Sequence, residues 1–246
     1  MTRSQYALCA LLLAIAAPAG AITADELAAK SIEARGGAAA LDAIQNVRRS
    51  GRLVAGGGQR IYGVVETRRR PDSIREDLSL QGLTQVQSYD GSEGWKIDPF
   101  GGRKDPERVP ADDLKGLVEN AAIGGPLAGY RERGDTLDYL GTEDIDGTVA
   151  HKLKLTSKGG DLRYLYLDPD HFLEIRIESQ RTVRGVRRTI VTDLGEYEKV
   201  EGVYWPLALT FGRKGSQDPV KVQYEKVEVN LTLDPAYFSF PAGAKN

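Results

Sequence analysis

The segment HKLKLTSKGGDLRYLYLDPDHFLEIRIE, residues 151–178, decides the fold because it holds three apolar runs separated by two turns. Leu153 and Leu155 alternate with lysines, which is the period-two pattern of a strand with one buried face. A glycine pair at 159–160 and an Asp-Pro-Asp sequence at 168–170 supply the turns. The segment therefore predicts three successive antiparallel strands.

The same succession of apolar runs and turns continues on both sides of this segment. A glycine triplet at 56–58 is interpreted as a hairpin turn, and a phase change at Glu225 and Lys226 predicts a β-bulge. Roughly ten or eleven strands, each beside its predecessor, indicate a meander curled into an incomplete antiparallel barrel, so the fold class is mainly β with a few helices. The strands are predicted at residues 51–55, 60–69, 74–80, 86–89, 95–97, 152–156, 162–167, 172–178, 203–211 and 220–229.

A helix is predicted ahead of the first strand. Thr23 is suited to cap its N-terminus, and Asp25 and Glu26 lie in the first turn, where the helix dipole favours negative charge. A glycine pair at 36–37 ends this helix, and a second short helical turn is expected at 38–44.

Residues 110–123 interrupt the run of strands. The pattern is amphipathic and helical, with a proline at its start and Gly-Gly-Pro directly after it. Because this helix stands between two groups of strands, we expect it to fold across the mouth of the barrel as a lid. The predicted lid residues are Leu114, Leu117, Val118 and Ala121.

The N-terminus has the features of a secretory signal peptide. Arg3 is followed by an apolar run at 6–17, a proline, and the small-x-small sequence Ala-Gly-Ala at 19–21. This run is too short to cross about 30 Å of hydrocarbon, although an uncleaved membrane anchor stays an alternative. We therefore predict cleavage after residue 21, a single domain over 22–246, and a periplasmic location.

Composition excludes several classes of function. The only cysteine, Cys9, leaves with the predicted signal peptide, so the mature chain would have no disulfide, thiolate metal site or cysteine nucleophile. The formal net charge is −2, and no basic patch or stripe stands out along the sequence. We therefore expect no nucleic-acid partner.

Motifs for catalysis are sparse. The only histidines, His151 and His171, lack partners at metal-ligand spacing, so no metal and no cofactor are predicted. No serine lies in a G-x-S-x-G elbow, and carboxylate pairs fall in turns, where they bond backbone amides. We therefore predict that the protein is not an enzyme.

A barrel of this strand number can enclose an apolar cavity, but a solid core of side chains fits the pattern equally well. Both faces of several predicted strands carry bulky apolar residues, so the face that lines a cavity is open for each strand. The candidate lining residues are Trp95, Ile97, Leu153, Leu155, Tyr164, Tyr166, Ile175, Trp205, Leu207 and Leu209.

Several motifs spread over most of residues 22–246 resemble those of the LolA/LolB superfamily, in its branch of outer-membrane-lipoprotein-sorting-like proteins. They are YDGSEGWKIDPF at 89–100, DDL at 112–114, GPL at 125–127, HKLKLT at 151–156, YLYLD at 164–168, LEI at 173–175, KVEVN at 226–230, DPAYF at 234–238 and FP at 240–241.

The resemblance implies an incomplete barrel with a helical lid over a hydrophobic cavity for acyl chains. Its best-known members carry lipoproteins across the periplasm, and relatives bind other lipids or sense envelope stress. This sequence departs from them in length and in an extended insertion at 99–110. Our hypothesis is a monomeric periplasmic carrier for the acyl chains of a lipid or lipoprotein, with an envelope membrane protein as the donor or acceptor of the cargo. The alternative is an envelope-stress sensing or scaffolding module that uses the same fold to bind a protein, and an enzyme is a third class.

Overall fold

The computed structural model describes residues 22–242. The predicted signal peptide, residues 1–21, lies outside the described residues. Between residues 22 and 242, no helix is long and apolar enough to cross a membrane.

Two helices precede the sheet, as predicted. Helix α1 (Ala24–Ala34) begins at Thr23, whose hydroxyl accepts from the Glu26 amide while the Glu26 carboxylate accepts from the Thr23 amide. Helix α2 (Ala38–Ala43) follows after two residues of loop beyond the helix cap. The buried face of α1 packs through Leu27 against the sheet.

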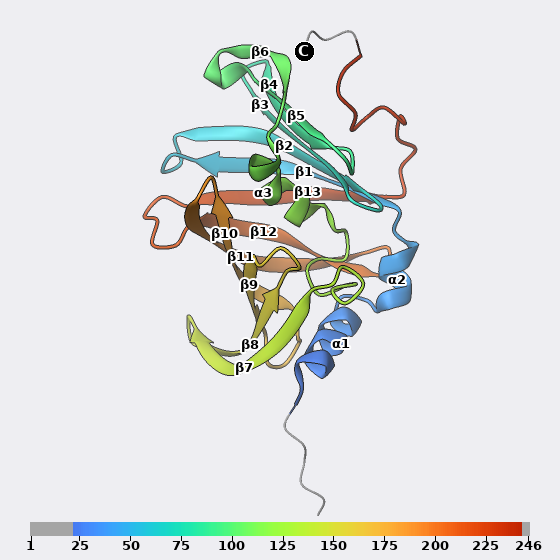
Figure 1. The fold of residues 1–246 in the computed structure, drawn as a ribbon, viewed down its shortest axis with the longest axis vertical. Helices are drawn as coiled ribbons and strands as arrows, with labels where there is room; N and C mark the ends of the chain where they lie inside the picture. The colour runs from blue at the N-terminus through green and yellow to red at the C-terminus, as the bar shows by residue number, and fades with distance from the viewer. Residues whose placement is uncertain (1–21, 243–246) are drawn as a thin grey trace, which may run out of the picture.

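All strands form one antiparallel sheet in the order β6-β5-β4-β3-β2-β1-β13-β12-β11-β10-β9-β8-β7. The sheet is curled and does not close into a barrel over the described residues, which confirms the predicted incomplete barrel (Figure 1). The strands are β1 (Asn46–Ala55), β2 (Arg60–Arg69), β3 (Ser73–Leu80), β4 (Leu83–Tyr89), β5 (Gly94–Asp98), β6 (Arg103–Arg108), β7 (Thr136–Ile145), β8 (Thr148–Thr156), β9 (Leu162–Leu167), β10 (Glu174–Val183), β11 (Val186–Val200), β12 (Val203–Arg213) and β13 (Val220–Val229).

Each strand pairs with the next one along the chain, as the predicted meander requires, except at the step from β6 to β7. Strands β1 to β6 run outward from the centre of the sheet to one edge, and β7 to β13 run inward from the other edge. Helix α3 (Ala111–Ala121) stands in the connection between these two edge strands, so this connection must pass across the concave side of the sheet. The two halves join where β1 pairs with β13.

The predicted bulge lies in this central pairing. Ser50 pairs with Lys226 and Gly51 pairs with Tyr224, so Glu225 is the extra residue on β13. A Cβ at position 51 would overlap the backbone of β13, and glycine therefore permits the close approach of the two strands there. The bulge bends the sheet between its two halves.

The strand count exceeds the expected ten or eleven because three strands were not listed from the sequence. The insertion at 99–110 forms a 3-10 turn (Pro99–Gly101) and the edge strand β6. Strand β7 lies at the opposite edge. Most of its residues alternate between half-buried and exposed, which makes its apolar pattern a weak signal. Strand β11 is polar along much of its length and has no fully buried residue.

Candidate functional site

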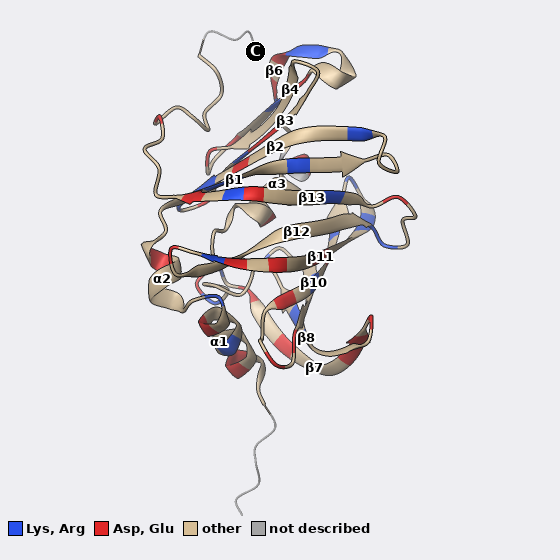
Figure 2. Cartoon of the chain, turned by 180° about the vertical axis from the view of Figure 1, so that it is seen from behind, with Lys and Arg blue, Asp and Glu red and all other residues tan. Residues whose placement is uncertain are grey.

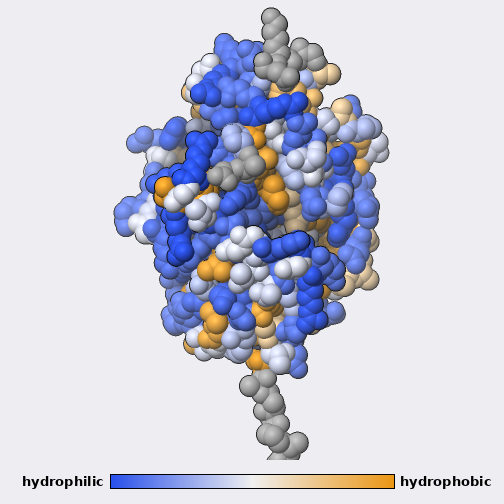
Figure 3. Space-filling view, viewed as in Figure 1, coloured by the Kyte–Doolittle hydropathy of each residue, from blue (hydrophilic) through white to orange (hydrophobic). Residues whose placement is uncertain are grey.

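The concave side of the sheet encloses a cavity of about 430 Å³, which we call the interior cavity. Strands β1 to β3, strands β10 to β13 and helix α3 all contribute to its lining, so the sheet wraps around it. Its apolar half is lined by Leu53, Val64, Leu78, Ile190, Leu209, Phe211 and Val222. The molecular surface, by contrast, has hydrophobic areas that are small and separate in the view of Figure 3.

The other half of the interior cavity is charged. Arg49 on β1 and Glu66 on β2 face each other in register, with Arg49 Nη2 donating to Glu66 Oε1 at 2.8 Å. Both side chains are almost fully buried. Arg68 Nη2 donates to the second oxygen, Glu66 Oε2, at 3.1 Å, so one carboxylate is held by two arginines.

The arginines set the charge state of Glu66. Burial alone would raise the pKa of this carboxyl, but the charges of Arg49 and Arg68 outweigh burial and lower the pKa to about 2. The guanidinium of Arg49 also lies 4.1 Å from the centre of the Tyr224 ring, and the Tyr224 hydroxyl lies 3.4 Å from Glu66 Oε2. Glu66 is therefore ionised at any physiological pH.

Glu76 is the second carboxylate in the charged half, and it lines the interior cavity directly. Within residues 22–242, no hydrogen bond or ion pair reaches its carboxyl group. Burial, together with the neighbouring negative charge of Glu66, raises the pKa of Glu76 to about 7, although the charges of Arg68 and Arg49 oppose the rise. Glu76 thus changes its charge near neutral pH, inside a cavity.

We expect the Glu76→Gln variant to gain stability over the wild-type protein, and we expect this gain to be larger at pH 8 than at pH 5. The folded-state pKa of Glu76 lies above the unfolded value of 4.5, so the wild-type protein loses stability as the pH rises from about 4.5 to about 7. The glutamine variant lacks this loss of stability. With a discount for solvent screening, the loss is on the order of 2 kcal/mol.

Urea unfolding at the two pH values measures the effect as a difference between variant and wild type, which cancels the other titrating groups. Glu198→Gln, at an exposed position on β11, is the matched control and should show no such difference. An equal pH response of the Glu76→Gln variant and the wild-type protein would contradict a half-buried, unpartnered Glu76 with a raised pKa.

Helix α3 closes the interior cavity with polar side chains. Glu119 and Asn120 of this helix line the cavity opposite the sheet, and Glu119 accepts a hydrogen bond from Arg181 Nη1 at 2.8 Å. Arg163 Nη2 lies 3.5 Å from the same carboxylate. Among the charged residues that line the interior cavity, Arg49, Arg68 and Arg181 stand against Glu66 and Glu119, which leaves one positive charge, or none when Glu76 is ionised.

Two kinds of contact hold α3 in place. On the β3 side, Leu117 and Ala121 pack against Ile74 in an apolar cluster. On the opposite side the contacts are polar, because Lys115 Nζ donates to the Thr182 carbonyl at 3.1 Å. Below the helix, Arg68 Nη1 donates to the Ala122 carbonyl at 3.3 Å, which ties the end of α3 to the charged half of the interior cavity.

The predicted lid residues do not face the interior cavity. Leu114 and Val118 line a groove of about 620 Å³ on the outer side of α3, and Val118 is 39% exposed. Leu117 and Ala121 are buried against β3. The helix is placed as expected, at the mouth of the curled sheet, but its inward side is polar.

Five of the ten candidate lining residues lie on the concave face of the sheet: Leu153, Leu155, Trp205, Leu207 and Leu209. Leu209 lines the interior cavity, and Trp205 lines a smaller hollow of about 130 Å³ that continues from it beneath α3. Leu155 lines the outer groove, while Leu153 packs beneath α1. The apolar half of the interior cavity thus contains one of the ten.

The other five candidates lie on the convex face: Trp95, Ile97, Tyr164, Tyr166 and Ile175. The C-terminal segment after β13 covers Trp95, whose Nε1 donates to the Phe238 carbonyl at 2.9 Å. Tyr166 is buried in a separate cluster with Ile145 and Ala150. Their burial comes from this outer packing, so we assign them no role in the interior cavity.

The charged residues of the cavity were not recognised in the sequence. Glu66 occupies an inward position that the alternation along β2 assigns to the buried face, two residues after Val64. A charged residue in a buried phase of a strand is the signal that could have found it.

The histidines have structural surroundings. His151 Nδ1 lies 3.0 Å from the Tyr139 hydroxyl, and its ring stacks on Phe172. His171 lies in the β9–β10 turn, where its Nδ1 is 3.1 Å from Asp168 Oδ1. In the part of the chain that the structure describes, no three His, Cys, Asp or Glu side chains cluster in a way that could hold a metal ion.

No family model matches this sequence, and no curated protein matches it. Solved structures do match over most of the chain. A LolA superfamily protein from Nitrosomonas europaea is 16% identical with a TM-score of 0.59, and the match covers 88% of this chain and 98% of that protein. A DUF1329 family protein from Desulfovibrio piger is 13% identical with a TM-score of 0.58, over 88% of this chain and 95% of that one.

A third match is a domain from Vibrio parahaemolyticus described as an outer membrane lipoprotein-sorting protein. It is 10% identical with a TM-score of 0.56, and the match covers 86% of this chain and 97% of that domain. At these identities the matches bear on the fold, and they confirm the resemblance expected from the motifs at that level. The chain has the fold of the LolA superfamily.

Proposed function

We propose that this protein is a periplasmic carrier that holds an acyl-chain-bearing amphiphile non-covalently in the interior cavity. The observation that carries the proposal is the division of that cavity into an apolar half and a charged half. An acyl chain against the apolar half gains about 0.8 kcal/mol for each buried methylene. The headgroup then lies beside the arginines, whose guanidinium groups form charge-assisted hydrogen bonds with an anionic group such as a carboxylate or phosphate.

The size of the interior cavity fits this role. A volume of about 430 Å³ lies in the range of small-molecule sites, which bury most of a ligand's surface. The fold it shares with the Vibrio domain supports a lipoprotein acyl chain as one form of the cargo. The predicted signal peptide supports the periplasm as the place of action. Binding of this kind requires no covalent step, so we assign no catalytic residue.

Native mass spectrometry of the purified protein tests the proposal. We expect masses of one retained amphiphile per chain, and saturable displacement of a fluorescent fatty acid by unlabelled fatty acid. A fatty alcohol of the same length should compete less well, because it lacks the negative charge that the arginines favour. No retained lipid together with no saturable probe binding would contradict the carrier and favour a module that binds a protein.

A further inference from the structure

Three neighbouring hairpins end side by side at one end of the sheet. Gly57 N, in the β1–β2 turn, donates to Asp218 Oδ1 in the β12–β13 turn at 2.7 Å. Lys214 N, in the same β12–β13 turn, donates to the Thr189 carbonyl at 3.0 Å, beside the β10–β11 turn. We call residues 56–61, 184–188 and 213–221 of these hairpins the basic rim.

The basic rim carries seven basic residues and one acidic residue, Asp218. Arg184 is paired with Asp113, and Lys214 with Glu178. The other five have no acidic partner within residues 22–242, and Figure 2 shows blue segments gathered around the β12–β13 loop and the adjacent end of β2. The seven are Arg60, Arg184, Arg187, Arg188, Arg213, Lys214 and Lys221.

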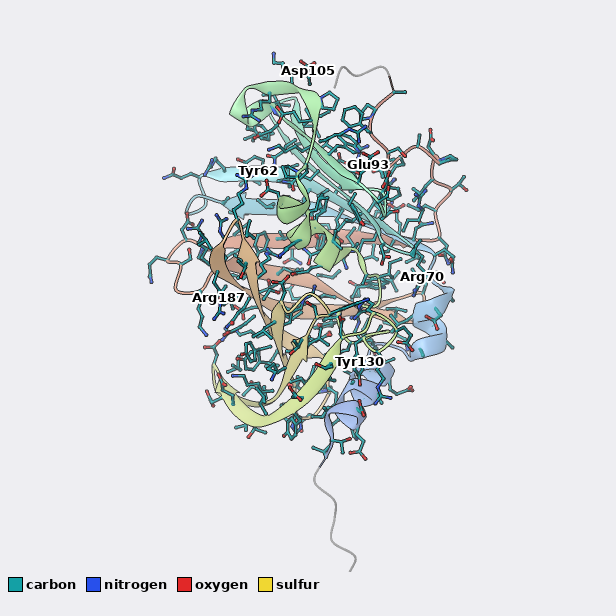
Figure 4. The ribbon with its side chains drawn as sticks, in the orientation of Figure 1. Tyr62, Arg70, Glu93, Asp105, Tyr130 and Arg187 are labelled. Carbon is teal, nitrogen blue, oxygen red and sulfur yellow. The ribbon has the colours of Figure 1, made fainter. Side chains whose placement is uncertain are left out.

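The opposite end of the sheet has the reverse charge. The turns at 70–72, 90–93, 168–173 and 201–202 together carry six acidic residues and one basic residue, Arg70. Arg187 and Arg70 lie on opposite sides of the molecule in Figure 4. The protein is thus strongly polarised although its formal net charge is only −2. The sequence showed no basic patch because the rim is assembled from three separate segments.

Exposed apolar side chains stand among these charges. Ile61 is 55% exposed at the start of β2, and Val186 is 57% exposed at the start of β11. Basic residues mixed with exposed aliphatic tips form a surface that suits the interface of an anionic bilayer. The rim has no aromatic residue, whereas base stacking on aromatic side chains is typical of proteins that bind single-stranded nucleic acid.

The basic rim also adjoins the apolar half of the interior cavity. Leu53, Phe211 and Val222 line that half, and each lies within a few residues of a rim hairpin on the same strand. The charged half, around Arg49 and Glu66, lies further along the strands toward the acidic end.

We propose that the basic rim docks on the surface of an anionic phospholipid bilayer, with the apolar half of the interior cavity nearest the bilayer. Cationic side chains attract the lipid phosphates, and Ile61 and Val186 enter the headgroup region. The acidic end then faces away from the membrane, because the same field repels it. This docking needs no cargo, so it stands or falls separately from the carrier function.

Vesicle co-sedimentation of the secreted protein tests the docking. Mass spectrometry first identifies the N-terminus of the sample. We expect binding to vesicles containing phosphatidylglycerol at low ionic strength and little binding to pure phosphatidylcholine vesicles. High salt should release the protein, since the Debye length shrinks from about 10 Å at 0.1 M to about 3 Å at 1 M. Each basic residue near such a surface contributes about fivefold, so Arg187→Gln, Arg188→Gln and Arg213→Gln together should weaken binding on the order of a hundredfold.

The matched control removes the same number of positive charges elsewhere. Lys30→Gln, Lys199→Gln and Lys226→Gln change exposed residues outside the rim and should leave vesicle binding within about twofold of the wild-type protein. Equal losses in the two triple variants would overturn the proposal. Equal binding to neutral and anionic vesicles, or binding to double-stranded DNA without any binding to vesicles, would overturn it as well.

Discussion

Glu66→Gln is expected to lower the free energy of unfolding by about 3–5 kcal/mol at pH 7. The change removes the negative charge that compensates Arg49 and Arg68, and the buried Arg49 is then left with uncharged acceptors and the Tyr224 ring. An uncompensated buried charge is far more costly than the same charge in water. Urea or guanidinium unfolding measures the loss as a lower midpoint with an unchanged slope.

Glu225→Gln is the matched control, since it removes the acidic partner of Arg52 on the same strand, β1. That pair is exposed, with 68% and 48% of the two side chains accessible, so its removal should cost less than about 1 kcal/mol. Adding Arg49→Met to Glu66→Gln should restore part of the loss, because the two residues are coupled. If the costs of Arg49→Met and Glu66→Gln simply add, the ion pair does not hold the cavity wall together.

Thr192→Trp is expected to weaken the binding of a fluorescent fatty acid on the order of a hundredfold. Thr192 points from β11 into the interior cavity, opposite Ile177 and Phe211 in register. An indole there occupies space that about four methylenes of an acyl chain would fill, and each excluded methylene costs about 0.8 kcal/mol. Fluorescence titration of the probe measures the change in Kd.

The neighbouring Val191 supplies the control, because successive residues of a strand point to opposite faces. Val191→Trp adds the same indole on the convex face, where the register pairs position 191 with Glu178 and Gly212. Probe affinity should then stay within about twofold of the wild-type value. Unchanged affinity in a folded Thr192→Trp variant would show that the probe binds elsewhere, for example in the outer groove.

Much of the fold follows from the sequence because the strands are short, alternate in polarity and are separated by turn residues. Helix α1 was predictable from its cap at Thr23, and the bulge from the phase change at Glu225. The edge strand β6 escaped because it is highly charged and contains Pro106. Pairing of β1 with β13 was missed because alternation along a strand says nothing about partners that are distant in the chain.

The site was harder to predict for two physical reasons. Apolar residues line both faces of the curled sheet, since the C-terminal segment buries the convex face over Trp95. A one-residue change of phase moves a side chain to the other face, so hydrophobicity alone could not assign Trp95 or Tyr166. The charged half was missed because Glu66 and Arg68 are buried only through partners on another strand and on α3.

The pairing of β1 with β13, the first and last strands of the sheet, has a consequence for how the chain folds. Strands β1 to β6 can pair with one another early, but β1 keeps one edge open until β13, the last strand of the sheet, arrives. Contacts between segments so far apart in sequence form slowly, and an open strand edge can pair with another chain. We therefore expect that the enclosed cavity forms late in folding, and that the exposed edge of β1 is the point most vulnerable to aggregation until then.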